Sequence, residues 1–419
     1  MAIDVTTLSA EASAGNLESQ LQLADLYENG FGVPLDYGQA SYWYRKAAEQ
    51  GSVVGQARLG QMYIKGKGVK EDAVEGVRWL TLAAKQNESS AQASLAWCYQ
   101  KGIGVQKNLH QAFDWYLQAA KLGHAGARYN LGYMYANGYG VDRDDQQAIE
   151  WYTRAAEQGH MKAQLNAGMM YAQGLGTEQN LTESARWYLE AAKQGYAKAQ
   201  YNLALMYAGG HGVEQNDKES FRWQNEAANQ GYARAQFNLG LLYLHGIGIE
   251  QDYEQAINWF QRAAHQNYGK AWYQLGKIYA EGVGIERNEN ISAKYYQLAA
   301  ESGYARAQYR LARLYDKGQG VQLNHSIAAD WYKKAARQGF YKAQYVLGVH
   351  YAKGKGVEKN YIKAYAWLIL AHEMDSPLYK DVVYRISSKM SESEISQAKQ
   401  LAIKWQEEYG ISLTAPVNL

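Results

Sequence analysis

Residues 127–159 read ARYNLGYMYANGYGVDRDDQQAIEWYTRAAEQG, and this stretch recurs along the chain at a fixed spacing. Tyr135 has a counterpart every 36 residues from Tyr27 to Tyr351, and Trp151 recurs at the same spacing except where Tyr295 replaces it. No insertion or deletion interrupts the ten repeats. A fixed period of about 20–50 residues is typical of stacked supersecondary units, so the repeat decides the fold.

Each repeat begins with one helical pattern. Ala199, Leu203 and Tyr207 are four residues apart and share one face of a helix. Gly or Ala follows the Leu, which lets a neighbouring helix approach closely, although Gly costs up to about 1 kcal/mol in helix propensity. Gly-x-Gly then ends the helix, because glycine adopts the positive φ that a chain reversal needs. With no preceding strand and no third Gly, this motif is not a nucleotide-binding fingerprint.

A second helical pattern follows. Asp or Asn stands seven residues before each Trp position, as Asp144 does before Trp151, and both residue types are favoured N-caps. In seven repeats Glu or Gln comes three residues later, which is the spacing of a capping box. An Ala-Ala pair and a final Gly or Asn complete the helix. One such helix pair cannot bury its aromatic face alone, so the sequence predicts stacked repeats around a continuous core.

The motif Ala-x-x-x-Leu-Gly-x-x-Tyr-x-x-Gly-x-Gly-Val, followed by Ala-x-x-Trp-Tyr-x-x-Ala-Ala-x-x-Gly, resembles the Sel-like repeat family over residues 15–375. This family is related to the tetratricopeptide repeats. The resemblance implies an all-α fold, a right-handed α-α superhelical solenoid of helix-turn-helix repeats, used as an adaptor or scaffold in protein complexes. It implies no catalytic residues. Tyr295, Thr177 and Ala167 depart from the pattern and concern local packing.

The two ends of the chain leave the repeat pattern, as the caps of a solenoid should. We expect an N-terminal capping helix within residues 1–20, ten repeats in one continuous solenoid over residues 21–375, a C-terminal capping helix region over 376–410 and a loose tail over 411–419. Ser391 and Glu394 have capping-box spacing and predict the start of the last helix.

Composition narrows the class of function. Lys and Arg total 43 and Asp and Glu total 41, so the chain as a whole is not a polycation suited to nucleic acid or membranes. The single cysteine, Cys98, excludes an internal disulfide and a cysteine-based metal site. No apolar run reaches the roughly 18 residues of a membrane span. Because no signal peptide is visible, we expect a cytoplasmic protein, with a periplasmic or secreted protein whose signal was removed as the alternative.

No motif with a catalytic mechanism is present. The nine His form no His-Glu-x-x-His pair, and no Ser, His and Asp arrangement has a recognisable signature. Cys98 lies next to Tyr99 on a packing helix, where a buried inert thiol is expected rather than a nucleophile. The sequence therefore predicts no enzyme, no cofactor and no metal, and a hydrolase is the least supported alternative.

Partner-binding residues are expected on the first helix of each repeat, which lines the concave face in the related tetratricopeptide solenoids. Nine residues before the repeat's Tyr stands a basic row: Lys162, Lys198, Arg234, Lys270, Arg306 and Lys342. Basic residues in a first helical turn oppose the helix dipole by about 0.3–1 kcal/mol each. Either the row attracts an acidic partner, or its members pair with acidic residues on adjacent helices or are merely solvated.

Two further rows should share this face. Six residues before the Tyr stands an aromatic row that includes Tyr201, Phe237, Tyr273 and Tyr309. These rings could contact a partner, since aromatic residues are enriched at binding hot spots, or could pack between neighbouring first helices as the inner wall. Five residues before the Tyr, Asn and Arg residues are Asn130, Asn166, Asn202, Asn238, Arg58 and Arg310. Asn side chains could hold the backbone of an extended peptide, or could bond between repeats.

Together these rows predict a protein-interaction scaffold that binds an extended or acidic segment of a partner protein in its concave groove. An envelope-associated or host-interacting bacterial factor is the alternative. The expected partner is a protein, without nucleic acid or membrane insertion, and we expect a monomer with a dimer as the alternative.

Overall fold

A computed structural model describes residues 5–372 and 376–411. The described residues form helices joined by turns, with no strand among them, and the fold is the predicted all-α solenoid of helical repeats. They belong to two compact units that divide between Gln215 and Asn216. Whether one continuous solenoid runs through that point stays a prediction.

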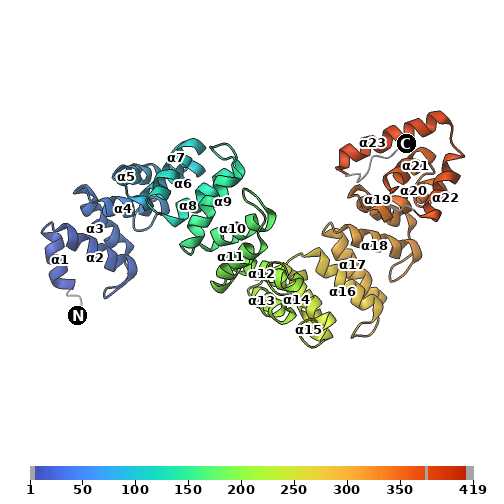
Figure 1. Cartoon of the computed structure of the whole chain (residues 1–419), viewed down its shortest axis with the longest axis horizontal. Coiled ribbons are helices and arrows are strands. Elements are labelled where there is room, and N and C mark those ends of the chain that lie inside the picture. Colours follow the sequence, from blue (N-terminus) through green and yellow to red (C-terminus); the bar gives the residue numbers. More distant parts are fainter. Residues whose placement is uncertain (1–4, 373–375, 412–419) are drawn as a thin grey trace. The chain divides into compact units, whose positions relative to one another are not determined.

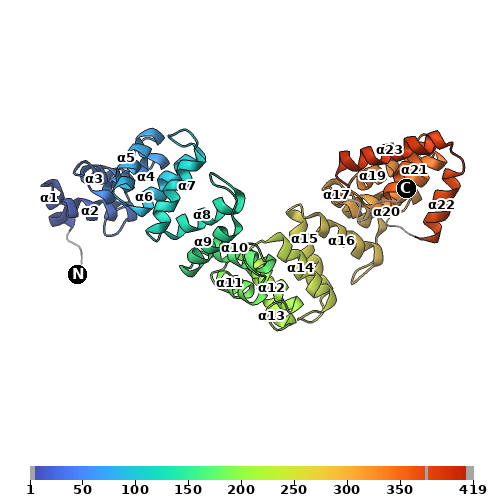
Figure 2. The ribbon, with the colours of Figure 1, turned by 45° about the horizontal axis from the view of Figure 1, so that its top comes forward.

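Within each unit the helices follow one another as pairs in sequence order (Figures 1 and 2). The first unit contains α1 (Val5–Ser13), α2 (Leu17–Asn29), α3 (Tyr37–Glu49), α4 (Val53–Lys65), α5 (Ala73–Lys85), α6 (Ser89–Lys101), α7 (Leu109–Lys121), α8 (Ala125–Asn137), α9 (Asp145–Glu157), α10 (Met161–Gln173), α11 (Leu181–Lys193) and α12 (Ala197–Gly209). The second contains α13 (Asp217–Asn229), α14 (Ala233–His245), α15 (Tyr253–His265), α16 (Gly269–Glu281), α17 (Glu289–Glu301), α18 (Ala305–Lys317), α19 (His325–Arg337), α20 (Tyr341–Lys353), α21 (Tyr361–Leu370), α22 (Pro377–Ser387) and α23 (Glu392–Tyr409).

The second helix of every repeat begins after the predicted Asp or Asn, but the capping-box prediction is wrong. Asp144 accepts the backbone N–H of Gln147 at 2.9 Å, as an N-cap should. The backbone N–H of Asp144 is not hydrogen bonded to the Gln147 side chain, as a capping box would require. It donates instead to the backbone carbonyl of Tyr135 at 3.0 Å. The same bond to the repeat's Tyr is present in nine repeats. That carbonyl therefore takes the place of the expected Glu or Gln side chain.

Apolar side chains are buried at the same positions in successive repeats. The Leu of nine first helices and the Ala-Ala pair of nine second helices are buried, as Leu239, Ala263 and Ala264 show. The small residue after the Leu faces the second helix: a Cβ added at Gly276 would lie 2.8 Å from Cδ1 of Tyr296. Close packing of first on second helix is the reason for the small residue, as predicted.

A buried glutamine row, which the sequence pattern did not single out, joins successive repeats. Its members stand seven residues before the repeat's Tyr: Gln20, Gln56, Gln92, Gln164, Gln200, Gln236, Gln308 and Gln344. Gln236 is representative. Its Nε2 donates to the carbonyl of Ala228 at 3.2 Å, and its Oε1 accepts from Nε2 of Gln266 at 2.8 Å. One side chain thus links the second helix of one repeat to both helices of the next, and buried amides need such partners.

Both ends carry additional helices. α1 covers the first repeat, whose first helix α2 begins at Leu17, before the expected boundary at residue 20. At the other end α23 lies along α21 (Figure 1). Trp405 of α23 stacks on Trp367 of α21 with ring centres 4.4 Å apart. The capping box at Ser391 and Glu394 is confirmed.

The expected loose tail does not begin at residue 411. Ile411 is 9% exposed and packs into the C-terminal core cluster. The rest of that segment, 412–419, lies outside the described residues.

Candidate functional site

The six residues of the basic row are all exposed on the first turns of α10, α12, α14, α16, α18 and α20. Within residues 5–372 and 376–411 none of the six forms an ion pair, so pairing with acidic residues on adjacent helices does not explain the row. Two have aromatic neighbours instead. Arg306 hydrogen bonds with Tyr304, and the Lys342 Nζ lies 5.8 Å from the centre of the Tyr341 ring.

The helix ends that carry this row are unusually electropositive. α12, α14, α16, α18 and α20 have Tyr or Phe at the N-cap, no side-chain cap hydrogen bond and no acidic residue in the first turn. A helix N-terminus already carries a partial positive charge, and a cation in its first turn adds to that charge. The first helices of these repeats therefore present positive charge that the described part of the chain leaves unneutralised.

The aromatic row lies between repeats. The ring of Tyr309 lies between Tyr332, with centres 5.8 Å apart, and Phe340, with centres 5.3 Å apart. Tyr273 has the corresponding position between Tyr296 and Tyr304. Phe237 likewise packs on two rings, and Tyr201 is half-buried. Inner-wall packing is therefore one role of these rings, and their exposed edges remain available.

The asparagine row is divided. Asn166 hydrogen bonds with Tyr152 of the preceding repeat, and Asn202 does the same with Tyr188. These two residues support the repeat-to-repeat alternative. Asn130 lines a cavity in the first unit, and Asn238 is half-buried on α14. Arg58 is exposed on α4.

Five predicted residues meet in one cavity of about 400 Å³ in the second unit. We call it the basic cavity, and its lining comes from α16, α18 and α20 and the turn before α20: Tyr273, Arg306, Tyr309, Arg310, Arg313, Phe340, Tyr341 and Lys342. Four of these side chains are cationic, and no described lining residue is a carboxylate. The walls between the cations are aromatic, so the cavity combines charge with large apolar contact surfaces.

The arginines of the basic cavity are held in place by its aromatic walls. Burial would lower the pKa of Arg310, but the hydrogen bond with Tyr273 and the nearby Tyr296 and Tyr309 together more than offset this, and the pKa is raised. The Cζ of Arg313 lies 5.9 Å from the centre of the Tyr309 ring, within range of a cation–π contact. An Arg side chain can hold a carboxylate through two parallel hydrogen bonds.

Arg313, Phe340 and Tyr341 belong to the basic cavity but were not among the predicted site residues. Arg313 stands seven residues after Arg306, which places both on the same face of α18. Reading a fourth row, two residues before the repeat's Tyr, would have found it.

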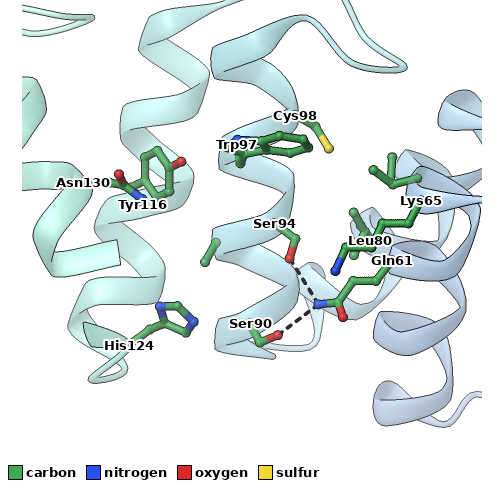
Figure 3. Close-up of a pocket in the computed structure, with 12 residues that line it drawn as sticks. Gln61, Lys65, Leu80, Ser90, Ser94, Trp97, Cys98, Tyr116, His124 and Asn130 are labelled. Atoms are coloured by element: carbon green, nitrogen blue, oxygen red, sulfur yellow. Dashed lines mark hydrogen bonds between the residues drawn. The ribbon is translucent and has the colours of Figure 1, made fainter. Parts of the chain in front are cut away.

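A second cavity, of about 370 Å³, opens in the first unit over α6 (Figure 3). Its lining residues are Gln61, Ile64, Lys65, Leu80, Ser90, Ala93, Ser94, Trp97, Cys98, Tyr116, His124 and Asn130. Gln61 donates from Nε2 to the hydroxyls of Ser90 and Ser94, each at 3.3 Å. Only Asn130 among these was predicted as a site residue. We call this space the α6 cavity.

Comparison with known proteins agrees with the fold and the repeat. The Sel1 repeat family matches ten segments, from 17–52 to 342–376, and the chain belongs to that family. A protective antigen of uropathogenic Escherichia coli with an SLR fold, c5321, is 30% identical, with 100% of this chain and 99% of that chain covered and a TM-score of 0.69. A Sel1 repeat protein from Oxalobacter formigenes is 32% identical over 72% of this chain and 87% of its own, with a TM-score of 0.59. No curated protein matches.

Sel1 repeat proteins generally mediate protein–protein interactions, and the family is generally non-enzymatic. In the described part of the chain no group of His, Cys, Asp and Glu could hold a metal ion. Nor does any helix there combine the length and apolarity that crossing a bilayer requires.

Proposed function

We propose that the protein is an interaction scaffold whose second unit binds an acidic, extended segment of a partner protein in the basic cavity. The observation that carries this proposal is the grouping of Arg306, Arg310, Arg313 and Lys342 around one hollow without a lining carboxylate. Like charges brought together repel one another, and an anionic guest would remove that repulsion.

The geometry favours carboxylates on a flexible chain over a single buried ion. Arg306 and Lys342 stand at the first turns of α18 and α20, whereas Arg310 and Arg313 lie further along α18. The cations are thus spread over two helices rather than directed at one point. Two or more acidic side chains could each meet a different cation, while the aromatic edges of Tyr273 and Tyr309 contact the chain between them.

The test uses a capped dodecapeptide of alternating Glu and Ala, with a Gln-Ala peptide as the uncharged comparison, and calorimetric titration of the full chain. We expect the Glu peptide to bind and the Gln peptide to bind at least about tenfold more weakly. Charge reversal by Arg306→Glu and Lys342→Glu should abolish binding, because the guest would then face repulsion. Raising the salt concentration should weaken it, since exposed charges are screened.

A matched control carries the same change in net charge elsewhere in the second unit. Lys218 and Lys294 are exposed on second helices and lie outside the basic cavity. Lys218→Glu with Lys294→Glu should leave binding within about twofold of the unmodified chain, because distant surface charges are screened. Equal losses in both double variants would show that net charge, rather than the cavity, attracts the peptide. Crosslinking from native lysate with the same variants would then identify the natural partner.

An envelope-associated or host-interacting factor is a second candidate. The likeness to a protective antigen of uropathogenic Escherichia coli over the whole chain supports it. Fractionation of the native cells with an antibody to this protein tests it: recovery from the periplasm or the medium would favour this function, and recovery from the cytosol alone would contradict it.

A further inference from the structure

The α6 cavity exists because the third repeat lacks side chains that other repeats have. At the three positions of the predicted rows it carries Ser90, Ala93 and Ser94, where the sixth repeat carries Lys198, Tyr201 and Asn202. The two helices have the same length and the same place in the repeat. The hollow over α6 therefore lies where a ring and two polar side chains stand in the sixth repeat.

The neighbouring repeat shows which group fits such a place. In the fourth repeat the ring of Tyr129 lies between Tyr152 and His160, stacked on His160 with ring centres 4.7 Å apart. The third repeat has the same two walls, Tyr116 and His124, at the same sequence spacing, and both line the α6 cavity. Between them the third repeat has Ala93 in place of a tyrosine. The two aromatic walls are therefore present, but no side-chain ring stands between them at position 93.

The rim of the cavity supplies polar and charged contacts. Gln61 and Lys65 reach from α4 toward Ser94 on α6, as Figure 3 shows. Lys65 is exposed, and no described lining residue is a carboxylate. Burial lowers the pKa of His124, so its ring is neutral near pH 7 and its face is suited to an uncharged aromatic guest. Because Lys65 is positively charged, the rim would best match a guest that carries an acidic residue next to its aromatic side chain.

An exposed apolar row leads away from the cavity. Two residues before the repeat's Tyr stand Trp97, Tyr133, Met169 and Leu205, which are 40%, 38%, 37% and 42% exposed. They lie on four consecutive first helices of the first unit, α6, α8, α10 and α12. Large apolar side chains repeated in the open on one helix face mark an interaction surface. An extended chain that starts at the α6 cavity could follow this row.

From these observations we propose that the α6 cavity receives an aromatic side chain of an extended segment of another protein. The ring stacks between Tyr116 and His124 above Ala93, and an acidic residue next to it in that segment meets Lys65. This site lies in the first unit and uses none of the residues of the basic cavity. Its test is therefore independent of the test of the function proposed above.

The test measures residue preference with a peptide array. Capped decapeptides carry Phe, Tyr, Leu or Ala at a central position, flanked by either Asp or Lys, in an otherwise constant Ser-Ala background. We expect the full chain to be retained by Phe and Tyr peptides with Asp neighbours at least about tenfold better than by the Ala peptides. The absence of any aromatic preference would overturn the proposal.

Two variants locate the preference. Ala93→Tyr fills the cavity with the residue that the fourth repeat has between the same walls, so it should fold, as circular dichroism can verify, and should lose the aromatic preference. Lys65→Glu leaves the hollow open and should change the preferred neighbour from Asp to Lys. Arg306→Glu with Lys342→Glu, in the second unit, should leave the aromatic preference unchanged.

Each contrary result is decisive. A folded Ala93→Tyr chain that keeps the preference places the aromatic site elsewhere. If Ala93→Tyr is misfolded, the Lys65→Glu variant decides. An unchanged preference for Asp in that variant would overturn the proposed placement of the peptide, in which the acidic residue next to the ring meets Lys65. Sedimentation that shows a dimer of the unmodified chain, lost in Ala93→Tyr, would assign the cavity to a second copy and reject a foreign partner.

Discussion

Replacement of Gly104 by alanine should weaken the chain far more than the same replacement at Gly32. Both are the second glycine of their Gly-x-Gly turns, with φ of 67° and 74°. A residue with a Cβ pays a comparable penalty of about 1–2 kcal/mol at either φ. Their surroundings differ. A Cβ at Gly104 would lie 2.1 Å from the carbonyl oxygen of Ala73 in the preceding repeat, whereas a Cβ at Gly32 meets nothing within 4 Å.

The magnitude follows from that distance. Real Cβ atoms essentially never approach closer than 3.0 Å, so the turn of the third repeat and the start of α5 would have to separate from 2.1 Å to at least that distance. Because the contacting atom belongs to the backbone, no side-chain rotation relieves the clash. Overpacking of this kind costs about 1–3 kcal/mol or more. We expect a loss of about 1–2 kcal/mol for Gly32→Ala and about 2–5 kcal/mol for Gly104→Ala.

The assay has to resolve individual repeats, because long repeat arrays need not unfold in two states. Hydrogen exchange measured by mass spectrometry reports the local free energy of opening for each helix. In Gly104→Ala, exchange should speed up in α5 and α6, on either side of the strained contact. In Gly32→Ala it should change only in α2 and α3. Equal losses at the two sites would refute the reasoning, since they would show that φ alone, and not the approach of the preceding repeat, requires glycine.

Three further predictions concern single buried groups. Gln236→Leu should lower the free energy of unfolding of the second unit by about 0.5–1.5 kcal/mol in urea titrations, because the Ala228 carbonyl and the Gln266 amide each lose one hydrogen bond. Cys98 is 0% exposed and burial raises the pKa of its thiol to about 11, so it should resist a thiol reagent at pH 8 and react once urea unfolds the chain; rapid native reaction would contradict the packing. Burial lowers the pKa of His350 below the ordinary value of about 6.5, so the unfolded chain binds a proton more readily and the stability of the second unit should fall as pH drops below that value, a dependence that His350→Gln should reduce.

Periodicity was sufficient to predict the features that depend on one residue type at one place in every repeat. The caps such as Asp144, the turn glycines and the buried Leu and Ala-Ala positions have local physical causes, so ten copies reinforce the same inference. The glutamine row was not predicted, because the residue type does not by itself indicate a buried position. Gln is common on solvated helix faces, and nothing in its chemistry distinguishes Gln236, whose amide joins two repeats, from an exposed glutamine.

The candidate site was predicted in part. The rows place Arg306, Arg310 and Lys342 on one side of their helices, because a helix face can be read from spacing, and all three line the basic cavity. The rows could not show that Asn166 is bonded to Tyr152, since that partner belongs to the second helix of the preceding repeat. Such a contact depends on how two repeats pack, and spacing along the chain does not give that geometry.

The two cavities arise in different ways from one backbone. The basic cavity comes from charges added to positions that face outward in each repeat, and reading residue types along the rows reveals it. The α6 cavity comes from a side chain that is missing: Ala93 stands where Tyr129 stacks on His160 one repeat later. In a chain whose repeats share one geometry, a small residue between aromatic walls that recur in the next repeat is as informative as an arginine. Binding sites in such solenoids should therefore be sought at departures toward small residues as well as at rows of charge.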